Sequence, residues 1–451
     1  MGPNSLFTPR ASLAALGLRL QAWGVWEVVR DQLQIKQKVH AYQPLDKVLD
    51  CFINILAGGA GLVEINLLVR PDVGVQRAFG RPTCAEQSTI SDTLNACTPE
   101  NVEQLRSAVQ LILRQQSQSY AHDYAAAWQV LDVDTTGLPA GRLGEGVTKG
   151  YFAGRKRCRG RQLGRVVAAA YDELIVDQLY DGKHQLERSL PQLVEMAETA
   201  LNLGENQRMR TVLRVDAGGG SETNINWMLR RGYFLLIKIH SWQRVRKLMR
   251  SVTDWSIDPR VPSRQVGWVT RPYAYARPTR QIALRKLKSN GKWLYQVLVF
   301  NLTDDMLFAL RHQPQPQPCT TQDILFAALA AYDQRGGAAE TQNKGDKQGL
   351  HLAHRNKHSF VAQEMLVLLA QLAHNLLIWT RNDLARADRH FACYGIQRMV
   401  RDVLQIPGWV QLDEAEHVVS ITLQDNHPLA TKVQFALVNR LRSDEMSPYL
   451  G

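Results

Sequence analysis

The stretch TVLRVDAGGG, residues 211–220, is apolar for most of its length, reaches Asp216 and then continues into three glycines. A short apolar run bounded by such a turn signal is typical of a buried strand. A carboxylate at the mouth of a buried strand loses hydration, and it needs a cation, a hydrogen-bond donor or a metal ion to compensate. Asp216 is therefore the first candidate functional residue.

The segments on either side alternate between strand and helix patterns. Strand-like runs lie at 128–134, 162–171, 173–180 and 233–240, and amphipathic helix patterns lie at 191–203 and 222–232. Three strands followed by helix, strand, helix and strand predict a mixed α/β unit built on one sheet.

The rest of the chain divides around this unit. We expect a helical part at 1–125, the first part of the α/β core at 126–250, a separate β-rich insertion at 251–311, a linker and helix completing the core at 312–383, and a mainly helical C-terminal region at 384–451. Asn290-Gly291 predicts a hairpin turn in the insertion. Thr98, Pro99 and Glu100 predict a helix start, and the short helix at 86–97 is either a recognition helix or a surface helix of a bundle.

Composition limits the partners. The 54 Lys and Arg residues outnumber the 42 Asp and Glu residues, which gives a net charge of +12 and makes a polyanion the first partner to consider. Two uncharged apolar segments, 51–63 and 365–379, are shorter than the roughly 20 residues of a membrane span, so we expect core helices and no membrane partner. Six scattered cysteines and the lack of an export signal favour a cytoplasmic location.

A second strand also ends on acidic residues. QVLDVD places Asp132 and Asp134 on one strand face, and either could meet Asp216 if the two strands are neighbours. Converging carboxylates without Cys or His favour Mg²⁺ or Mn²⁺, and two such ions support phosphodiester cleavage. The structural alternative is that each aspartate caps a turn. The glycines match neither a G-x-G-x-x-G nor a Walker motif, and they are expected to leave backbone room before Ser221 caps a helix.

A third acid is available in YDQRGGAAETQNKGDK, residues 332–347. Gly336-Gly337 breaks a helix, and Glu340, Lys344 and Lys347 then share one face of a new helix. Taken alone, this pattern also fits a solvent-exposed Glu/Lys stripe.

Together, DVDTTG, LRVDAGGGSETNINWMLRRGYFLLIK and YDQRGGAAETQNKGDKQGL resemble the three catalytic blocks of bacterial insertion-sequence transposases of the DDE class. The resemblance spans about 128–350 and includes the Tyr-Arg-Glu-Lys signature of one branch, matched by Tyr332, Arg335, Glu340 and Lys347. That branch usually has three residues between the arginine and the glutamate, whereas this chain has four.

The resemblance implies a ribonuclease-H-like core in which Asp134, Asp216 and Glu340 bind two Mg²⁺ ions, or Mn²⁺. It implies that residues 1–125 bind DNA, that double-stranded transposon ends and target DNA are the substrates, and that the protein acts as a homodimer on DNA near the nucleoid. Asp132 remains the alternative to Asp134. The other functions considered are a metal-dependent nuclease and a non-catalytic DNA-binding relative.

Basic residues suggest where DNA binds. The cluster GRKRCRGRQLGR at 154–165 contains Arg155, Lys156, Arg157, Arg159, Arg161 and Arg165. So many cations in one loop suit phosphates. In the insertion, cations alternate with aromatic residues, including Trp268 and Trp293, which is typical of base stacking or of one packed sheet face. Tyr332, Arg335, Lys344 and Lys347 complete the predicted DNA-binding set. His351, His354 and His358 suggest either a metal site or, with Arg355 and Lys357, a DNA-facing segment.

Overall fold

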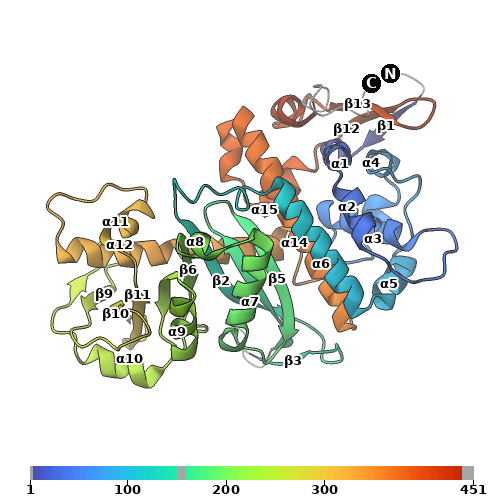
Figure 1. Ribbon diagram of the computed structural model, residues 1–451. Helices are drawn as coiled ribbons and strands as arrows, with labels where there is room; N and C mark the ends of the chain where they lie inside the picture. Colours follow the sequence, from blue (N-terminus) through green and yellow to red (C-terminus); the bar gives the residue numbers. More distant parts are fainter. Residues whose placement is uncertain (1–3, 151, 153–157, 439–451) are drawn as a thin grey trace.

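The computed structural model of the chain describes residues 4–150, 152 and 158–438. Figure 1 shows the N-terminal helices at one end of the molecule and the strands of the insertion at the other, with a central sheet between them. The N-terminal part consists of β1 (Ser5–Thr8), α1 (Ala11–Ala22), α2 (Val25–Gln32), α3 (Pro44–Leu56), α4 (Val73–Ala78), α5 (Gln87–Ala96) and α6 (Pro99–Gln116).

The central part is mixed α/β. Its elements are β2 (Gln129–Pro139), β3 (Thr148–Lys149), β4 (Arg159–Ala168), β5 (Glu173–Asp181), α7 (Leu186–Leu201), α8 (Glu205–Arg208), β6 (Thr211–Val215), α9 (Glu222–Arg230), β7 (Phe234–Lys238) and α10 (Trp242–Met249). The expected order of strands and helices is confirmed. α6 begins as expected, with the Thr98 side chain accepting from the Asn101 backbone and Pro99 in the first turn.

The remaining elements complete the sheet and cover it. They are β8 (Ser256–Ile257), β9 (Arg264–Trp268), β10 (Arg280–Leu287), β11 (Trp293–Phe300), α11 (Asp304–Ala309), α12 (Thr321–Asp333), α13 (Ala339–Gly349), α14 (Phe360–Ala387), α15 (Ile396–Arg398), β12 (Gly408–Leu412), β13 (Val418–Leu423) and α16 (Ala430–Val433). Between α12 and α13 lies a short 3-10 turn, Gln334–Gly336.

One large sheet runs through the molecule in the order β3-β4-β2-β6-β7-β11-β10-β9-β8, with β5 pairing with β4. β4 is antiparallel to β2 and β5, whereas β2, β6 and β7 are parallel. The side chains of β2 alternate: Leu131 and Val133 join the core that also contains residues of α7 and α9, whereas the opposite sheet face packs against α12.

The insertion is not the separate module that its sequence predicts. The hairpin at Asn290-Gly291 forms between β10 and β11, but β11 also pairs antiparallel with β7, and Val299 lies opposite Ile237. The insertion therefore continues the central sheet. A sequence pattern cannot reveal this, because the pairing joins segments about 60 residues apart through the sheet edge.

The described part of the C-terminal region is mainly helical, as expected, but it also contains two strands that the sequence analysis did not predict. β12 and β13 form a hairpin, and β1 from the start of the chain adds a third strand through pairs such as Phe7 with Trp409.

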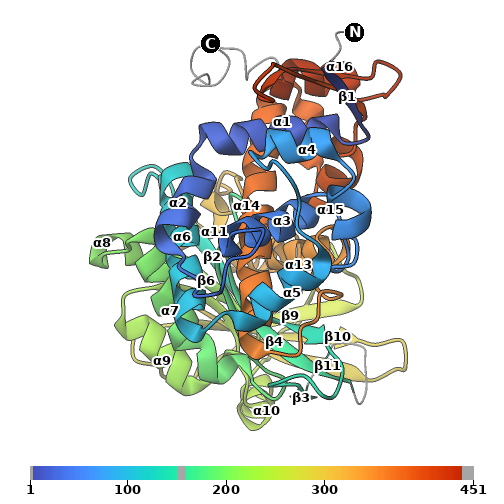
Figure 2. The same ribbon diagram turned by 90° about the vertical axis from the view of Figure 1, so that its right-hand side faces the viewer.

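Figure 2 shows α14 running beside the N-terminal helices. By length and composition α14 could cross a membrane, but 89% of its most apolar window is buried in this fold, as expected for a core helix.

α5, the candidate recognition helix, packs against α3 and α14. Its buried side is formed by Ile90, Thr93 and Leu94. This packing is that of a surface helix in a bundle, and its polar outer face remains available for binding.

Candidate active site

Asp134 and Asp216 are brought together by strand register. β2 and β6 are parallel neighbours, and Val133 lies opposite Val215. Asp134 is the next residue of β2, and Asp216 directly follows the last residue of β6, so the two aspartates are neighbours where β6 ends. β2 itself continues to Pro139, so the expectation that this strand ends at Asp134 is wrong. Asp216 also accepts from the Gly218 backbone nitrogen at 2.8 Å, which is the turn-capping role considered as an alternative. The two roles coexist at this residue.

The glycines after Asp216 are explained by close backbone approach. A Cβ on Gly220 would lie 1.7 Å from the carbonyl oxygen of Lys238 on β7, so no other residue fits there. Ser221 then caps α9, because its hydroxyl accepts from the Asn224 nitrogen. Both sequence-based expectations for this turn are confirmed.

The Asp132 carboxylate is already paired with a side chain of the core. It is fully buried, and both of its carboxylate oxygens accept from Arg214, at 2.6 and 2.9 Å. The same guanidinium donates to the Ala331 carbonyl on α12. Asp132 therefore fixes α12 to the sheet, and Asp134 is the better candidate ligand.

Arg335 links Asp134 to Glu340. Its guanidinium lies 2.8 Å from Asp134 Oδ1 and 3.7 Å from Glu340 Oε1. The Arg335 side chain is 7% exposed, whereas that of Glu340 is 65% exposed in the first turn of α13. Burial raises the pKa of Asp134 to about 6; Arg335 opposes this shift, and Asp216 adds to it. Two of the three predicted acids, Asp134 and Glu340, therefore flank one buried cation.

Tyr332 and Lys238 pack against each other inside the protein, next to the acidic site. Tyr332 is buried, and the Lys238 ammonium lies 4.6 Å from the centre of its ring. Burial lowers the pKa of Lys238 and raises that of Tyr332. The buried Tyr332 side chain is not placed to contact DNA in this structure. The sequence analysis missed Lys238, although it ends the third parallel strand at the same sheet edge.

α13 is held in place by a buried cluster of four charged or titratable residues. Arg165 pairs with Asp177 at 2.7 Å and with Asp346 at 2.6 Å, and His374 lies 2.6 Å from Asp346. We call Arg165, Asp177, Asp346 and His374 the buried cluster. It ties α13 to β4, β5 and α14, and so positions Glu340. Arg165 therefore has a structural role rather than the DNA contact expected of the basic loop.

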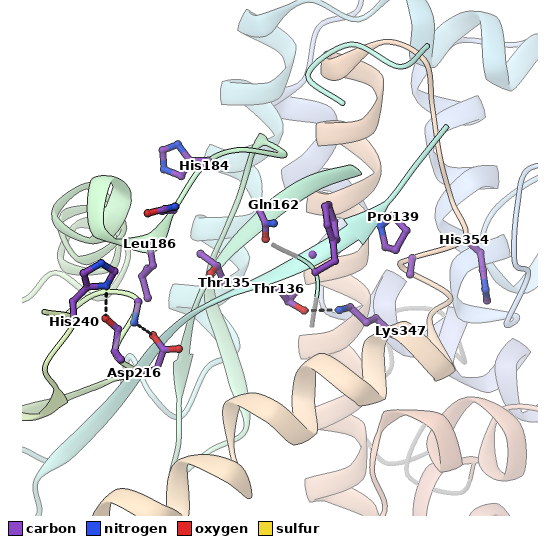
Figure 3. A pocket seen from close by; sticks show the side chains of 16 residues that line it. Thr135, Thr136, Pro139, Gln162, His184, Leu186, Asp216, His240, Lys347 and His354 are labelled. Atoms are coloured by element: carbon purple, nitrogen blue, oxygen red, sulfur yellow. Dashed lines mark hydrogen bonds between the residues drawn. The ribbon is translucent and has the colours of Figure 1, made fainter. Parts of the chain in front are cut away.

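A cavity of about 800 Å³ opens beside Asp216. Figure 3 shows Asp216 and His240 on one side of it and Lys347, which reaches Thr136 on β2, on the other. His184, His240 and Gln162 also line the cavity. None of these three was predicted. His240 had a sequence signal, because it is the last residue of the strand-like run at 233–240.

Lys344 does not share this cavity with Lys347. It lines a different hollow, of about 380 Å³, together with Thr341, Arg381 and Arg398. Glu340, Lys344 and Lys347 occupy positions i, i+4 and i+7 of α13 and so share one helix face as predicted, but the Lys344 and Lys347 side chains border different hollows.

The basic loop is only partly described. Arg155, Lys156 and Arg157 lie outside the described residues, and Arg159 is exposed at the start of β4. Arg161 is 1% exposed, and its guanidinium donates to the carbonyls of Glu145, Lys357 and His358. In this conformation it cannot reach a DNA phosphate, so the DNA-contact prediction for Arg161 does not hold.

The two tryptophans differ. Trp268 packs beside Phe300, and its indole nitrogen donates to the Thr321 carbonyl, which fits the packed-face alternative. Trp293 is 37% exposed near the hairpin tip, with the Arg285 guanidinium 5.1 Å from its ring centre. Trp293 therefore remains a base-stacking candidate.

Arg355, expected to face DNA, is buried and donates to the Leu350 and Gly59 carbonyls.

The donor set fits a hard divalent cation. Asp134, Asp216 and Glu340 offer only oxygen ligands, which Mg²⁺ and Mn²⁺ prefer. Within residues 4–150, 152 and 158–438, no three His, Cys, Asp or Glu side chains are already gathered closely enough to hold a metal. The Arg335 guanidinium instead supplies the positive charge between two of the acids, and it marks the place where a cation is needed.

Comparisons with known proteins give similarity to solved structures only. No protein-family model and no curated protein sequence matches the chain. The chain is similar to a piggyBac transposase in a cryo-EM structure of its synaptic complex with hairpin DNA, with a TM-score of 0.48 and 10% sequence identity over 96% of this chain and 83% of that one. A similarity this weak does not identify a function.

Proposed function

We propose that the protein is a DDE transposase that cleaves DNA at the ends of an insertion sequence and joins those ends to target DNA. The observation that supports this most is that Asp134, within β2, and Asp216, just after β6, lie on neighbouring strands, with Glu340 linked to Asp134 through Arg335. The strand order β5-β4-β2-β6-β7, with only β4 antiparallel to its neighbours, supports a ribonuclease-H-like core. Assignment to the Tyr-Arg-Glu-Lys branch rests on the sequence motifs.

Asp134, Asp216 and Glu340 would hold two Mg²⁺ ions, or Mn²⁺. When bound, such ions activate the attacking oxygen and stabilise the leaving one in an in-line displacement. The chain's own residues bind and orient the DNA. Lys347 and Thr136 present a cation and a hydroxyl to a phosphate at the cavity wall, and the buried cluster keeps α13 in position.

Arg335 has two roles in this proposal. Without DNA and metal, it neutralises Asp134 and Glu340. With both bound, its guanidinium is released from the carboxylates and can pair with a backbone phosphate, which it matches in geometry. Two ends must be processed together, so the active form in this proposal is a homodimer on double-stranded DNA.

The test uses purified protein, Mg²⁺, labelled DNA from either side of its gene and a target plasmid. The wild type should give cut ends and joined products. Glu340→Gln should lose both while still binding duplex DNA. Glu103→Gln is the matched control, because Glu103 is also an exposed helical glutamate paired with an arginine.

Three results would contradict the proposal. Cut ends without any joined product would indicate a nuclease. Full activity in Glu340→Gln would show that Glu340 is not part of the site, and a wild type that binds DNA without cutting it would indicate a non-catalytic relative.

A further inference from the structure

The helix α13 separates two hollows. On one side, Lys347 lines the cavity that contains Asp216. On the other side, Lys344, Thr341 and Gln348 form one wall of the second hollow, which we call the α13 groove. Residues 392–398 form its opposite wall, and Arg381 of α14 closes one end.

The charge lining the α13 groove is positive. Lys344, Arg381 and Arg398 line it, and Asp172 is the single carboxylate among its lining residues. Both oxygens of Asp172 are already used: one accepts from Gln342 at 2.7 Å and the other pairs with Arg381 at 2.9 Å. Within the described part of the chain, Lys344 is exposed and makes no ion pair.

Arg398 is held in an orientation that suits an incoming anion. Its guanidinium lies 3.7 Å from the centre of the Tyr394 ring, and one edge pairs with Asp402 at 3.3 Å. The side chain is still 43% exposed. A stacked guanidinium loses little conformational entropy when its free edge binds a phosphate.

The α13 groove opens beside the acidic site. Gly337 and Thr341 line it, and they lie on either side of Glu340 in the sequence. The proposed catalytic glutamate therefore lies on the same helix as Lys347 of the cavity and directly beside Thr341 of the groove wall. A reaction that joins two DNA molecules needs a place for each within reach of one acidic site.

We propose that the α13 groove binds the phosphodiester backbone of the target duplex, while the cavity beside Asp216 receives the cleaved end. This rests on the proposed function. The groove offers cations and backbone rather than a set of side chains for reading base edges, so binding there is independent of sequence.

The test measures binding of a short random-sequence duplex at several salt concentrations, without Mg²⁺. Lys344→Met/Arg398→Gln should weaken binding and reduce the slope of log affinity against log salt by about 2, since each phosphate contact contributes roughly 0.9. Arg230→Gln/Arg246→Gln is the control, because it also removes two exposed charges, on α9 and α10. An equal effect of the two double variants would overturn the proposal.

A second arm separates this proposal from the proposed function. With Mg²⁺ and flanking DNA, Lys344→Met/Arg398→Gln should still cut the ends but form roughly tenfold less joined product. If the double variant joins DNA as well as the wild type does, the role proposed for the α13 groove is wrong, while the proposed transposase function still stands. A wild type that neither cuts nor joins would overturn the transposase, and the salt slope would still decide whether the groove binds duplex DNA. Thermal unfolding of both double variants checks that each is folded.

Discussion

Two arginine–carboxylate clusters lie on neighbouring parts of the same sheet, and they differ in how completely they are satisfied. In the buried cluster, Arg165 is 1% exposed and donates to Asp177, Asp346 and Asn343. In the acidic site, the Arg335 Nε has no partner among the described residues, and Glu340 is largely exposed. The buried cluster, whose hydrogen bonds are satisfied, stabilises the fold. In the acidic site, Arg335 can exchange a carboxylate for another partner.

The largest expected effect tests the acidic site. Asp216→Ala should reduce cleavage by roughly 10³-fold, because losing a metal ligand removes about 4 kcal/mol of transition-state stabilisation. Duplex binding should persist, since Asp216 carries no positive charge. Cleavage by the purified variant is the measurement. Activity within a few fold of the wild type would remove Asp216 from the site.

Next, the buried cluster should matter for stability. Asp346→Ala should lower the free energy of unfolding by about 3–5 kcal/mol, because Arg165 and His374 would keep buried polar groups without their shared partner. Urea unfolding measures this. Asp216→Ala should cost less than about 1.5 kcal/mol in the same assay, the value of one backbone hydrogen bond. If both variants lose the same free energy of unfolding, the two clusters do not differ in their contribution to stability.

A smaller effect concerns the exchange of partners at Arg335. Arg335→Gln should raise the affinity of DNA-free protein for Mn²⁺ by about tenfold, because the competing guanidinium is removed from Asp134 and Glu340. Calorimetric titration measures it. Arg231→Gln is the control, since Arg231 also pairs with two carboxylates, Glu195 and Glu198. Unchanged or weaker Mn²⁺ binding in Arg335→Gln would show that the guanidinium does not compete.

The smallest expected effect is the stability of Glu340→Gln. The Glu340 carboxylate is exposed and 3.7 Å from its only arginine partner in the described residues, so the free energy of unfolding should change by less than about 0.5 kcal/mol. Urea unfolding is again the measurement. A loss above about 2 kcal/mol would mean that this residue supports the fold, as Asp346 does.

Local signals allowed much of the fold and site to be predicted. Apolar runs located β2 and the end of β6 before Asp216, although β2 continues past Asp134 to Pro139, and Gly336-Gly337 located the break before α13. These predictions succeeded because strand ends and helix breaks depend on residues close in the sequence.

The failures involve contacts between distant segments. Arg161 looked like part of an exposed basic loop, but carbonyls nearly 200 residues away enclose it. Lys344 and Lys347 were separated by the way α13 packs against β2, which helical periodicity alone cannot specify. The pairing of β11 with β7 likewise depends on the whole sheet.

The three-stranded sheet formed by β1, β12 and β13 has a consequence for synthesis of the chain. The Ile406 nitrogen donates to Ser12, 394 residues earlier, and β1 pairs only with β12. During translation β1 must therefore wait without its partner until residues 408–412 have left the ribosome. We infer that a chain interrupted before β12 leaves its N-terminal helices without this strand partner.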